Sequence, residues 1–300
     1  MGRKDGGRRT AARRGGRTIA ALAGVTWGLA AGIVAGALVV APALSAVGDT
    51  TTDSAAASTQ QALARAEAAE GELAAANELL GQKGAEFVEG VLRDNAVLVI
   101  YAPGSQPETY SRVAELLDAA GADPAGVVTL SEKFTSQQGA DELATIISHT
   151  LPAGAQLSTH NQSAATHAGE SFAQGLFTGA EGQARASQND RDFLVSSLAE
   201  AGYVSTQGDV IAADAVVILT AEAEETSARF ADGAVGDFAV ALSARDVPVV
   251  VALQGSKNNS GVEIALSERG EHGVETVEIA ATEAGAINVI RALRAVLAQE

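Results

Sequence analysis

The stretches AVLVIY at residues 96–101, AVVIL at 215–219 and VPVVVAL at 247–253 decide the fold class of this chain. Each is wholly or almost wholly apolar, rich in β-branched residues and as long as an ordinary strand. Helical apolar spacing follows at 108–120, 230–244 and 283–299. Apolar strands that alternate with helices predict a mainly parallel sheet with both faces covered by helices. We therefore predict an acidic α/β domain over residues 95–300.

Weaker patterns complete this domain. Residues 126–130 and 274–280 are predicted as further strands, and 137–149, 163–177 and 190–201 as helices. The stretch 149–188 has the least strand character. If the domain has two lobes, this is where it would divide, into 95–150 and 188–300.

The N-terminal region has the pattern of a membrane anchor. No charged residue occurs from Thr18 to Gly48, and Ile19–Ala41 is a mostly apolar run of 23 residues. About 20 helical residues cross the hydrocarbon core of a bilayer. Residues 1–17 hold seven basic residues and one acidic residue. Positive charge stays in the cytoplasm, so we predict a cytoplasmic tail at 1–17, a transmembrane helix at 18–48 and an extracytoplasmic body.

A cleaved signal peptide is the alternative to an anchor. Ala41-Pro42-Ala43 resembles a small-residue cleavage site, and Arg8-Arg9 or Arg13-Arg14 would suggest a twin-arginine signal. The apolar run is longer than the 7–15 residues of a typical signal, which favours the anchor. N-terminal sequencing of the mature protein distinguishes the two.

Glycine recurs at every fourth position of this predicted span. Residues four apart share one helix face, and glycine lets a second helix approach closely. We therefore expect self-association of the span through Gly24, Gly28, Gly32 and Gly36.

Residues 49–94 are predicted as a helical stalk. A heptad pattern runs through Ala66, Leu73, Leu80 and Phe87, with companion positions at Leu63, Glu70, Asn77, Gly84 and Val91. Such spacing predicts a short parallel coiled coil that continues the pairing of the span. A single helix packed on the body is the alternative.

Charge and composition exclude several classes. The chain has a net charge of −17, so removing the +6 tail leaves −23 on residues 18–300. Such an acidic body would repel phosphates, and we expect no nucleic-acid partner. The chain contains no Cys, which excludes disulfides and thiolate metal sites. Its only Met is Met1, which excludes a relay of Cu(I) on thioethers.

The usual catalytic and nucleotide motifs are missing from the sequence. It contains no GxGxxG, GxxxxGK[ST], GxSxG or HExxH pattern, so we expect no enzyme and no evident cofactor. His160, His167 and His272 are the candidate ligands for a Cu(II) site shared with carboxylates. Ordinary surface histidine is the alternative for each.

Four stretches resemble one known family. They are AAANE at 74–78, VTLSEKF at 128–134, LPAGAQLST at 151–159 and RDFLVSSLAEAGYV at 191–204. In this order, behind an N-terminal span, they resemble the MctB family of actinobacterial copper transport proteins. The resemblance implies a role in copper homeostasis, with copper as a transported or weakly bound ion, and an outer-membrane channel. The competing hypotheses are an extracytoplasmic structural or partner-recruiting module and, third, an enzyme with a degenerate cleft.

Overall fold

The computed structural model describes residues 52–105, 111–152, 155–159, 162–220, 229–254, 260–270, 272–278 and 282–298. The chain forms two compact units, residues 1–76 and 77–300, with the boundary inside helix α2 (Thr52–Val88). The predicted tail, the transmembrane helix at 18–48 and the row Gly24, Gly28, Gly32 and Gly36 lie outside the described residues. Within those residues, no helix has the length and apolarity to cross a membrane.

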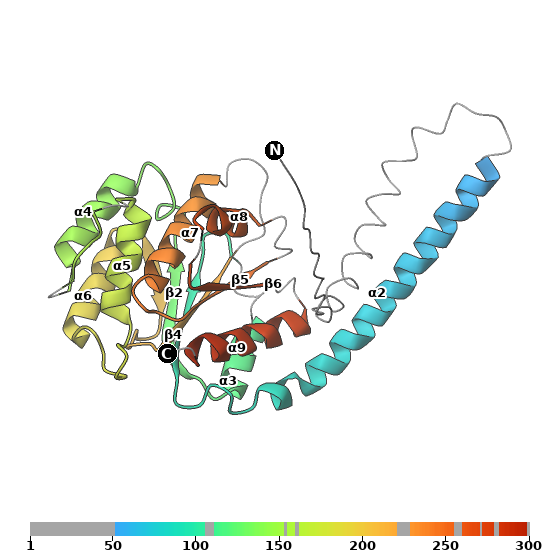
Figure 1. Cartoon of the computed structure of the whole chain (residues 1–300), viewed down its shortest axis with the longest axis horizontal. Helices are drawn as coiled ribbons and strands as arrows, with labels where there is room; N and C mark the ends of the chain where they lie inside the picture. Colours follow the sequence, from blue (N-terminus) through green and yellow to red (C-terminus); the bar gives the residue numbers. More distant parts are fainter. Residues whose placement is uncertain are drawn as a thin grey trace, which may run out of the picture. The chain divides into compact units, whose positions relative to one another are not determined.

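The second unit is built on one six-stranded sheet (Figure 1). Its strand order is β3-β2-β1-β4-β5-β6, and all neighbours run parallel except β3, which is antiparallel to β2 at one edge. Strands from both predicted lobes join this sheet, since β1 lies beside β4. The strands are β1 (Ala96–Tyr101), β2 (Asp123–Leu130), β3 (Val204–Gln207), β4 (Ala215–Leu219), β5 (Val249–Leu253) and β6 (Val274–Glu278).

Helices cover both faces of the sheet, as Figure 1 shows. The chain winds from β1 towards one edge and from β4 towards the other, and right-handed crossovers then place their helices on opposite faces. One face carries α4 (Ala140–Thr150), α5 (Ala164–Leu176), α6 (Gln188–Glu200), α7 (Arg229–Ser243) and α8 (Gly261–Glu268). The other carries α3 (Ser111–Ala119), α9 (Glu283–Leu297) and the end of α2.

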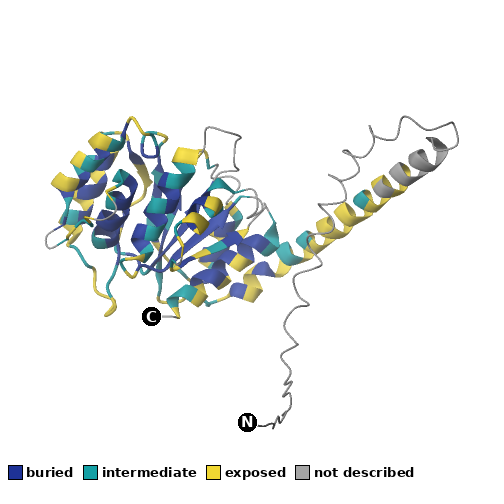
Figure 2. Cartoon of the chain, turned by 45° about the horizontal axis from the view of Figure 1, so that its top comes forward, coloured by how far each residue is buried: buried dark blue, intermediate teal, exposed yellow. Residues whose placement is uncertain are grey.

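The hydrophobic core lies in two layers, one on each face of the sheet. Strands β4 and β5 are buried at every position, which explains why their sequences show no alternation. Figure 2 shows these strands in dark blue. Phe172 and Phe238 fill the layer under α5 and α7, and Leu116 and Ile290 fill the layer under α3 and α9. The core therefore lies between the sheet and helices on both of its faces, as the sequence pattern predicts.

Within this second unit, the end of α2 packs against α3 and α9. Gly84 and Val88 are buried, and a Cβ at Gly84 would lie 3.4 Å from Ile287 Cδ1 of α9. Arg112 of α3 donates from Nη2 to Gly81 O at 2.9 Å and pairs through Nε with Glu283 Oε2 at 2.6 Å. Around Gly84, the stalk is therefore a single helix packed on the body, which is the alternative to a coiled coil there.

Candidate functional site

Ligands of open α/β sheets usually bind where the strand order reverses, here between β1 and β4. The loop after β1 turns at Gly104, whose φ is +78°. Ser105 Oγ then donates to Leu219 O at the end of β4, at 2.8 Å. Residues 106–110 and 221–228, which continue both loops, lie outside the described residues. The described part of this crevice is therefore a hydrogen-bonded turn.

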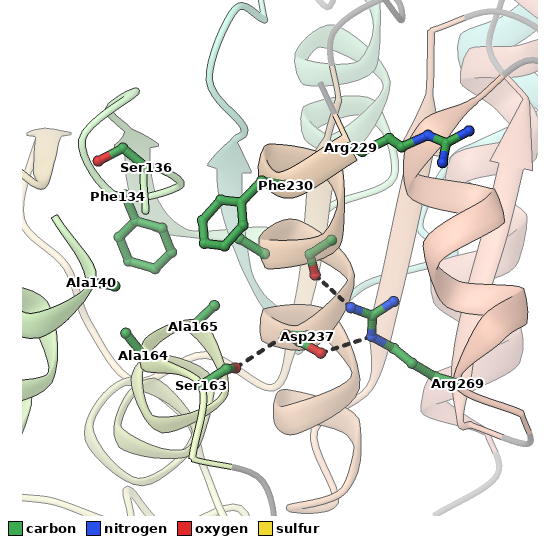
Figure 3. A pocket seen from close by; sticks show the side chains of 12 residues that line it. Phe134, Ser136, Ala140, Ser163, Ala164, Ala165, Arg229, Phe230, Asp237 and Arg269 are labelled. Atoms are coloured by element: carbon green, nitrogen blue, oxygen red, sulfur yellow. Dashed lines mark hydrogen bonds and ion pairs between the residues drawn. The ribbon is translucent and has the colours of Figure 1, made fainter. Parts of the chain in front are cut away.

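A hollow of about 260 Å³ opens in the helical layer that carries α4, α5 and α7. The N-terminal ends of α4, α5 and α7 surround it, and the end of α8 contributes a side chain to one wall. Figure 3 shows the rings of Phe134 and Phe230 on facing sides of the hollow, with alanine side chains nearby. Its lining consists of Phe134, Ser136, Ala140, Ser163, Ala164, Ala165, Arg229, Phe230, Gly233, Ala234, Asp237 and Arg269.

The two rings differ in how firmly they are held. Phe134 is 2% exposed and meets Phe238 edge to face, with ring centroids 5.6 Å apart. Phe238 in turn meets Phe172 at 5.3 Å, so Phe134 belongs to an aromatic column in the core. Phe230, by contrast, is 51% exposed. The hollow thus has one fixed aromatic wall and one that faces solvent.

An ion pair forms the polar end of the hollow. Arg269 Nε lies 2.8 Å from Asp237 Oδ1, and Ser163 Oγ donates to Asp237 Oδ2 at 3.1 Å (Figure 3). Arg269 also donates from Nη2 to Gly233 O at 2.8 Å, and from Nη1 to Ala265 O. The carboxylate and the guanidinium are therefore engaged with each other and tie α5, α7 and α8 together. The arrangement suits the binding of an apolar group between the rings.

Residues 155–159 of the LPAGAQLST stretch are held beside α5 by hydrogen bonds to polar side chains. Glu170, 8% exposed, accepts from Ser158 N at 2.8 Å and pairs with Arg245 Nη2 at 2.8 Å. The same Nη2 donates to Gln156 O at 2.7 Å. The LPAGAQLST stretch is thus fastened to α5 and to the end of α7.

The stretches VTLSEKF and RDFLVSSLAEAGYV meet at the β2–β3 edge. Lys133 Nζ lies 4.3 Å from the ring centroid of Tyr203 and 2.7 Å from Glu142 Oε2. The Tyr203 hydroxyl lies 2.8 Å from Gly139 O and 3.0 Å from Glu142 Oε2. Three of the four stretches that carry the family resemblance therefore make contacts that hold the fold together.

These contacts change the pKa values of the three groups. The hydrogen bond from Lys133 lowers the pKa of the Glu142 carboxyl, and the bond from Tyr203 acts in the same direction. The bond to Glu142 raises the pKa of Lys133. Burial raises the pKa of Tyr203, and its bond to Glu142 adds to this. Lys133 and Glu142 thus favour each other's charged form.

The structure does not assemble the predicted histidine site from the residues that it describes. His167 lies on α5 with Nε2 3.2 Å from Ser158 O. His272 accepts from Val274 N through Nδ1 at 3.3 Å. His160 lies outside the described residues. In the described ranges, no three His, Cys, Asp or Glu side chains are grouped to hold a metal ion.

Sequence reasoning missed the buried charges of the helical layer. Arg191 is 2% exposed and donates from Nη1 to Gln188 Oε1 at 2.6 Å. Burial lowers its pKa. Its position directly before an apolar helical run in RDFLV gave no signal of burial, because arginine usually begins such helices on the surface.

Comparison with known proteins shows the family of this chain. The family model described as "Copper transport outer membrane protein, MctB" matches residues 16–300. Proteins named "Copper transporter MctB" from Mycobacterium tuberculosis and Mycobacterium bovis are each 28% identical over 228 residues, covering 74% of this chain and 73% of theirs. A protein of the same name from Mycobacterium leprae is 25% identical over 216 residues, covering 70% of this chain and 63% of its own. This chain therefore belongs to the MctB family.

Proposed function

We propose that this protein contributes to copper homeostasis as a single-pass protein of the cell envelope. The observation that carries the proposal is the extent of the family match, residues 16–300, which takes in the predicted span, the stalk and the body together. Relatives that match 70–74% of this chain bear the name of copper transporters. In this proposal the basic tail stays in the cytoplasm and the acidic body lies outside.

The body acts in this proposal by binding a partner rather than by catalysis. The hollow between Phe134 and Phe230 has mainly apolar walls, and its carboxylate, Asp237, is already engaged by Arg269 and Ser163. One helix cannot enclose a pore, so transport would require several copies or a partner that carries the ion. In this proposal, the assembly transports copper or binds it weakly.

A strain that lacks the gene tests the copper role. We expect it to accumulate copper and to grow poorly on copper, and we expect the full-length gene to restore both properties. Cell copper content is measured by mass spectrometry at matched growth. Normal copper content in the deletion strain would contradict the copper role and favour a purely structural module.

The partner-binding role is tested with Phe230, the exposed ring. Phe230→Ala should leave folding unchanged and raise cell copper towards the level of the deletion strain. Phe193→Ala is the matched control, because Phe193 is 56% exposed but lies on α6 and does not line the hollow. Equal copper content in the two variants would argue against the hollow as the working site.

Localisation and direct metal binding need separate measurements. One span with its positive end inward is a natural anchor of the plasma membrane, whereas the family description names the outer membrane. Density fractionation of the envelope decides between them. Titration of the full-length protein in detergent with Cu(II), followed by calorimetry, tests whether copper binds directly.

A further inference from the structure

One face of α2 carries apolar side chains that stay exposed. Leu73 is 42% exposed and Phe87 is 63% exposed, and Leu80 between them is half-buried. These three residues lie seven positions apart, so they follow one another along a single face of the helix. Ala66 extends the row by one more heptad. Exposed apolar rows of this kind mark surfaces where another helix binds.

The structure shows which neighbours are free to join this row. On one flank, Gly84 and Val88 are covered by the body, so a second helix has no access there. On the other flank, Ala69 and Ala76 are exposed. These two residues lie three or four positions from Leu73, as partner positions of a heptad do. We name this surface the α2 stripe. It consists of Ala66, Ala69, Leu73, Ala76, Leu80 and Phe87, of which Leu80 also packs against the core layer under α3 and α9.

A hollow beside Phe87 would receive a ring of the same kind. It has a volume of about 390 Å³ and lies between the end of α2 and α9. Phe87 itself forms one wall, and the others are Leu80, Ala284, Ile287, Asn288 and Arg291. A surface that has an exposed ring next to a hollow can bind a second copy of itself under two-fold symmetry. The ring of each copy then enters the hollow of the other.

We propose that the α2 stripe binds the same stripe of a second copy of this chain, in parallel. The direction follows from the 51 residues that precede α2 and include the predicted span. Copies that leave the same side of one membrane present α2 in the same direction. Parallel pairing places each stripe residue opposite its own counterpart. Three of the six stripe residues are alanine, and such small side chains let the helix axes approach to about 8 Å.

The energetics favour pairing in the membrane over pairing in solution. A seam of about three heptads is marginal by itself, because helix formation carries a nucleation cost. The body removes part of this cost, since the bond from Arg112 to Gly81 O and the packing of Val88 already order the end of α2. Anchoring then raises the effective concentration of one stripe near another. This inference stands on α2, its hollow beside α9 and the predicted span, and it is independent of the copper role.

The absence of Cys from the sequence allows a clean crosslinking test. Single variants Ala69→Cys and Ala76→Cys are made in the full-length protein and treated in membranes with a short bis-maleimide. We expect both to shift from the monomer to the dimer band. Ala68→Cys and Ala75→Cys are the matched controls, because they are neighbouring exposed alanines that point away from the stripe. They should remain mostly monomeric.

A second set of variants tests whether the stripe causes the pairing. Leu73→Glu added to Ala76→Cys should abolish the dimer band, because it places two carboxylates in the seam, whereas Ala75→Glu added to Ala76→Cys should preserve it. Circular dichroism of both proteins checks that α2 and the body are folded. Any of three results would overturn the proposal. The first is equal crosslinking at residues 75 and 76, and the second is no crosslinking at 69 and 76. The third is that Glu70→Cys forms the dominant crosslink instead.

Discussion

At the residue scale, Glu170 shows how a buried charge is made tolerable. Its carboxylate accepts Ser158 N and pairs with Arg245, so both oxygens have partners. Arg245→Met keeps the aliphatic stem of the side chain but leaves this carboxylate without its cation. Because Arg245 is partly exposed and water can replace some of the interaction, we expect a loss of about 1–3 kcal/mol of unfolding free energy. Urea unfolding of the full-length protein in detergent measures it.

Lys83 provides the control for this prediction. It pairs with Glu86 at 2.6 Å, but both side chains are more than half exposed. Lys83→Met should therefore change the unfolding free energy by less than about 0.5 kcal/mol. If the two methionine variants are equally stable, the Glu170 pair contributes no more than a surface ion pair.

The Lys133–Glu142 pair predicts a dependence of stability on pH. The folded pKa of Glu142 is lowered, so its contribution is present above the unfolded value near 4.5 and is lost as the pH falls through the folded pKa. The pKa of Lys133 is raised, so its contribution is full below 10.5 and is lost as the pH rises through the folded pKa. Lys133→Met should therefore destabilise the protein at pH 7 and much less at pH 3. Thermal unfolding at both pH values measures the difference. A constant difference between the two proteins would contradict the assignment.

The residue scale is also where sequence reasoning was weakest. Lys133 and Tyr203 were both inside stretches used for the family resemblance, yet their contact joins residues 70 positions apart. Ser163 and Asp237 likewise form a contact over a long separation, 74 positions. Side-chain partners of this kind depend on which helices pack together, and a single sequence contains no periodic signal for that.

At the element scale, the buried parallel strands were predictable and the edges were not. The strand predicted at 96–101 is confirmed as β1, and β4 and β5 lie within the predicted apolar runs. Strand β3 was missed because VSTQ is short and has only one buried residue. Helix α8 was missed because eight residues are too few for a clear helical period. The stalk helix ends at Val88, earlier than predicted, and Gly90 and Asp94 follow with positive φ.

Close packing of α5 on α7 depends on Gly169. A Cβ built there would lie 2.6 Å from Phe238 O and 2.8 Å from Ala241 Cβ, both in α7. Gly169→Ala should therefore force the helices apart and lower the unfolding free energy by about 1–3 kcal/mol. Gly71→Ala is the matched control, because nothing lies within 4 Å of its Cβ position in α2. The Gly71→Ala change should raise the helicity of α2, since alanine favours a helix by about 1 kcal/mol over glycine. Urea unfolding and circular dichroism measure the two effects, and a stabilising Gly169→Ala would contradict the packing.

At the scale of the whole molecule, the α2 stripe offers an explanation of how a chain with one predicted span could take part in transport. A single predicted span cannot form a channel, yet the family description names copper transport. Pairing along α2 would bring two spans and two bodies together and would place two hollows lined by Phe134 and Phe230 in one assembly. A role in transport would then depend on the number of copies, which a variant with a broken stripe can test in cells.

Leu73→Glu is the variant that joins the two proposals. Leu73 is exposed, so the charge should leave the fold of α2 and of the body intact. If pairing is needed for copper homeostasis, a deletion strain that carries Leu73→Glu should accumulate copper as the empty strain does, while the same strain with Ala75→Glu should show normal copper content. Membrane levels of both proteins are matched by immunoblot before copper is measured. Normal copper in the Leu73→Glu strain, together with loss of the crosslinked dimer, would show that single copies suffice. The copper role would then lie in the body and its hollow, where the Phe230→Ala variant tests it separately.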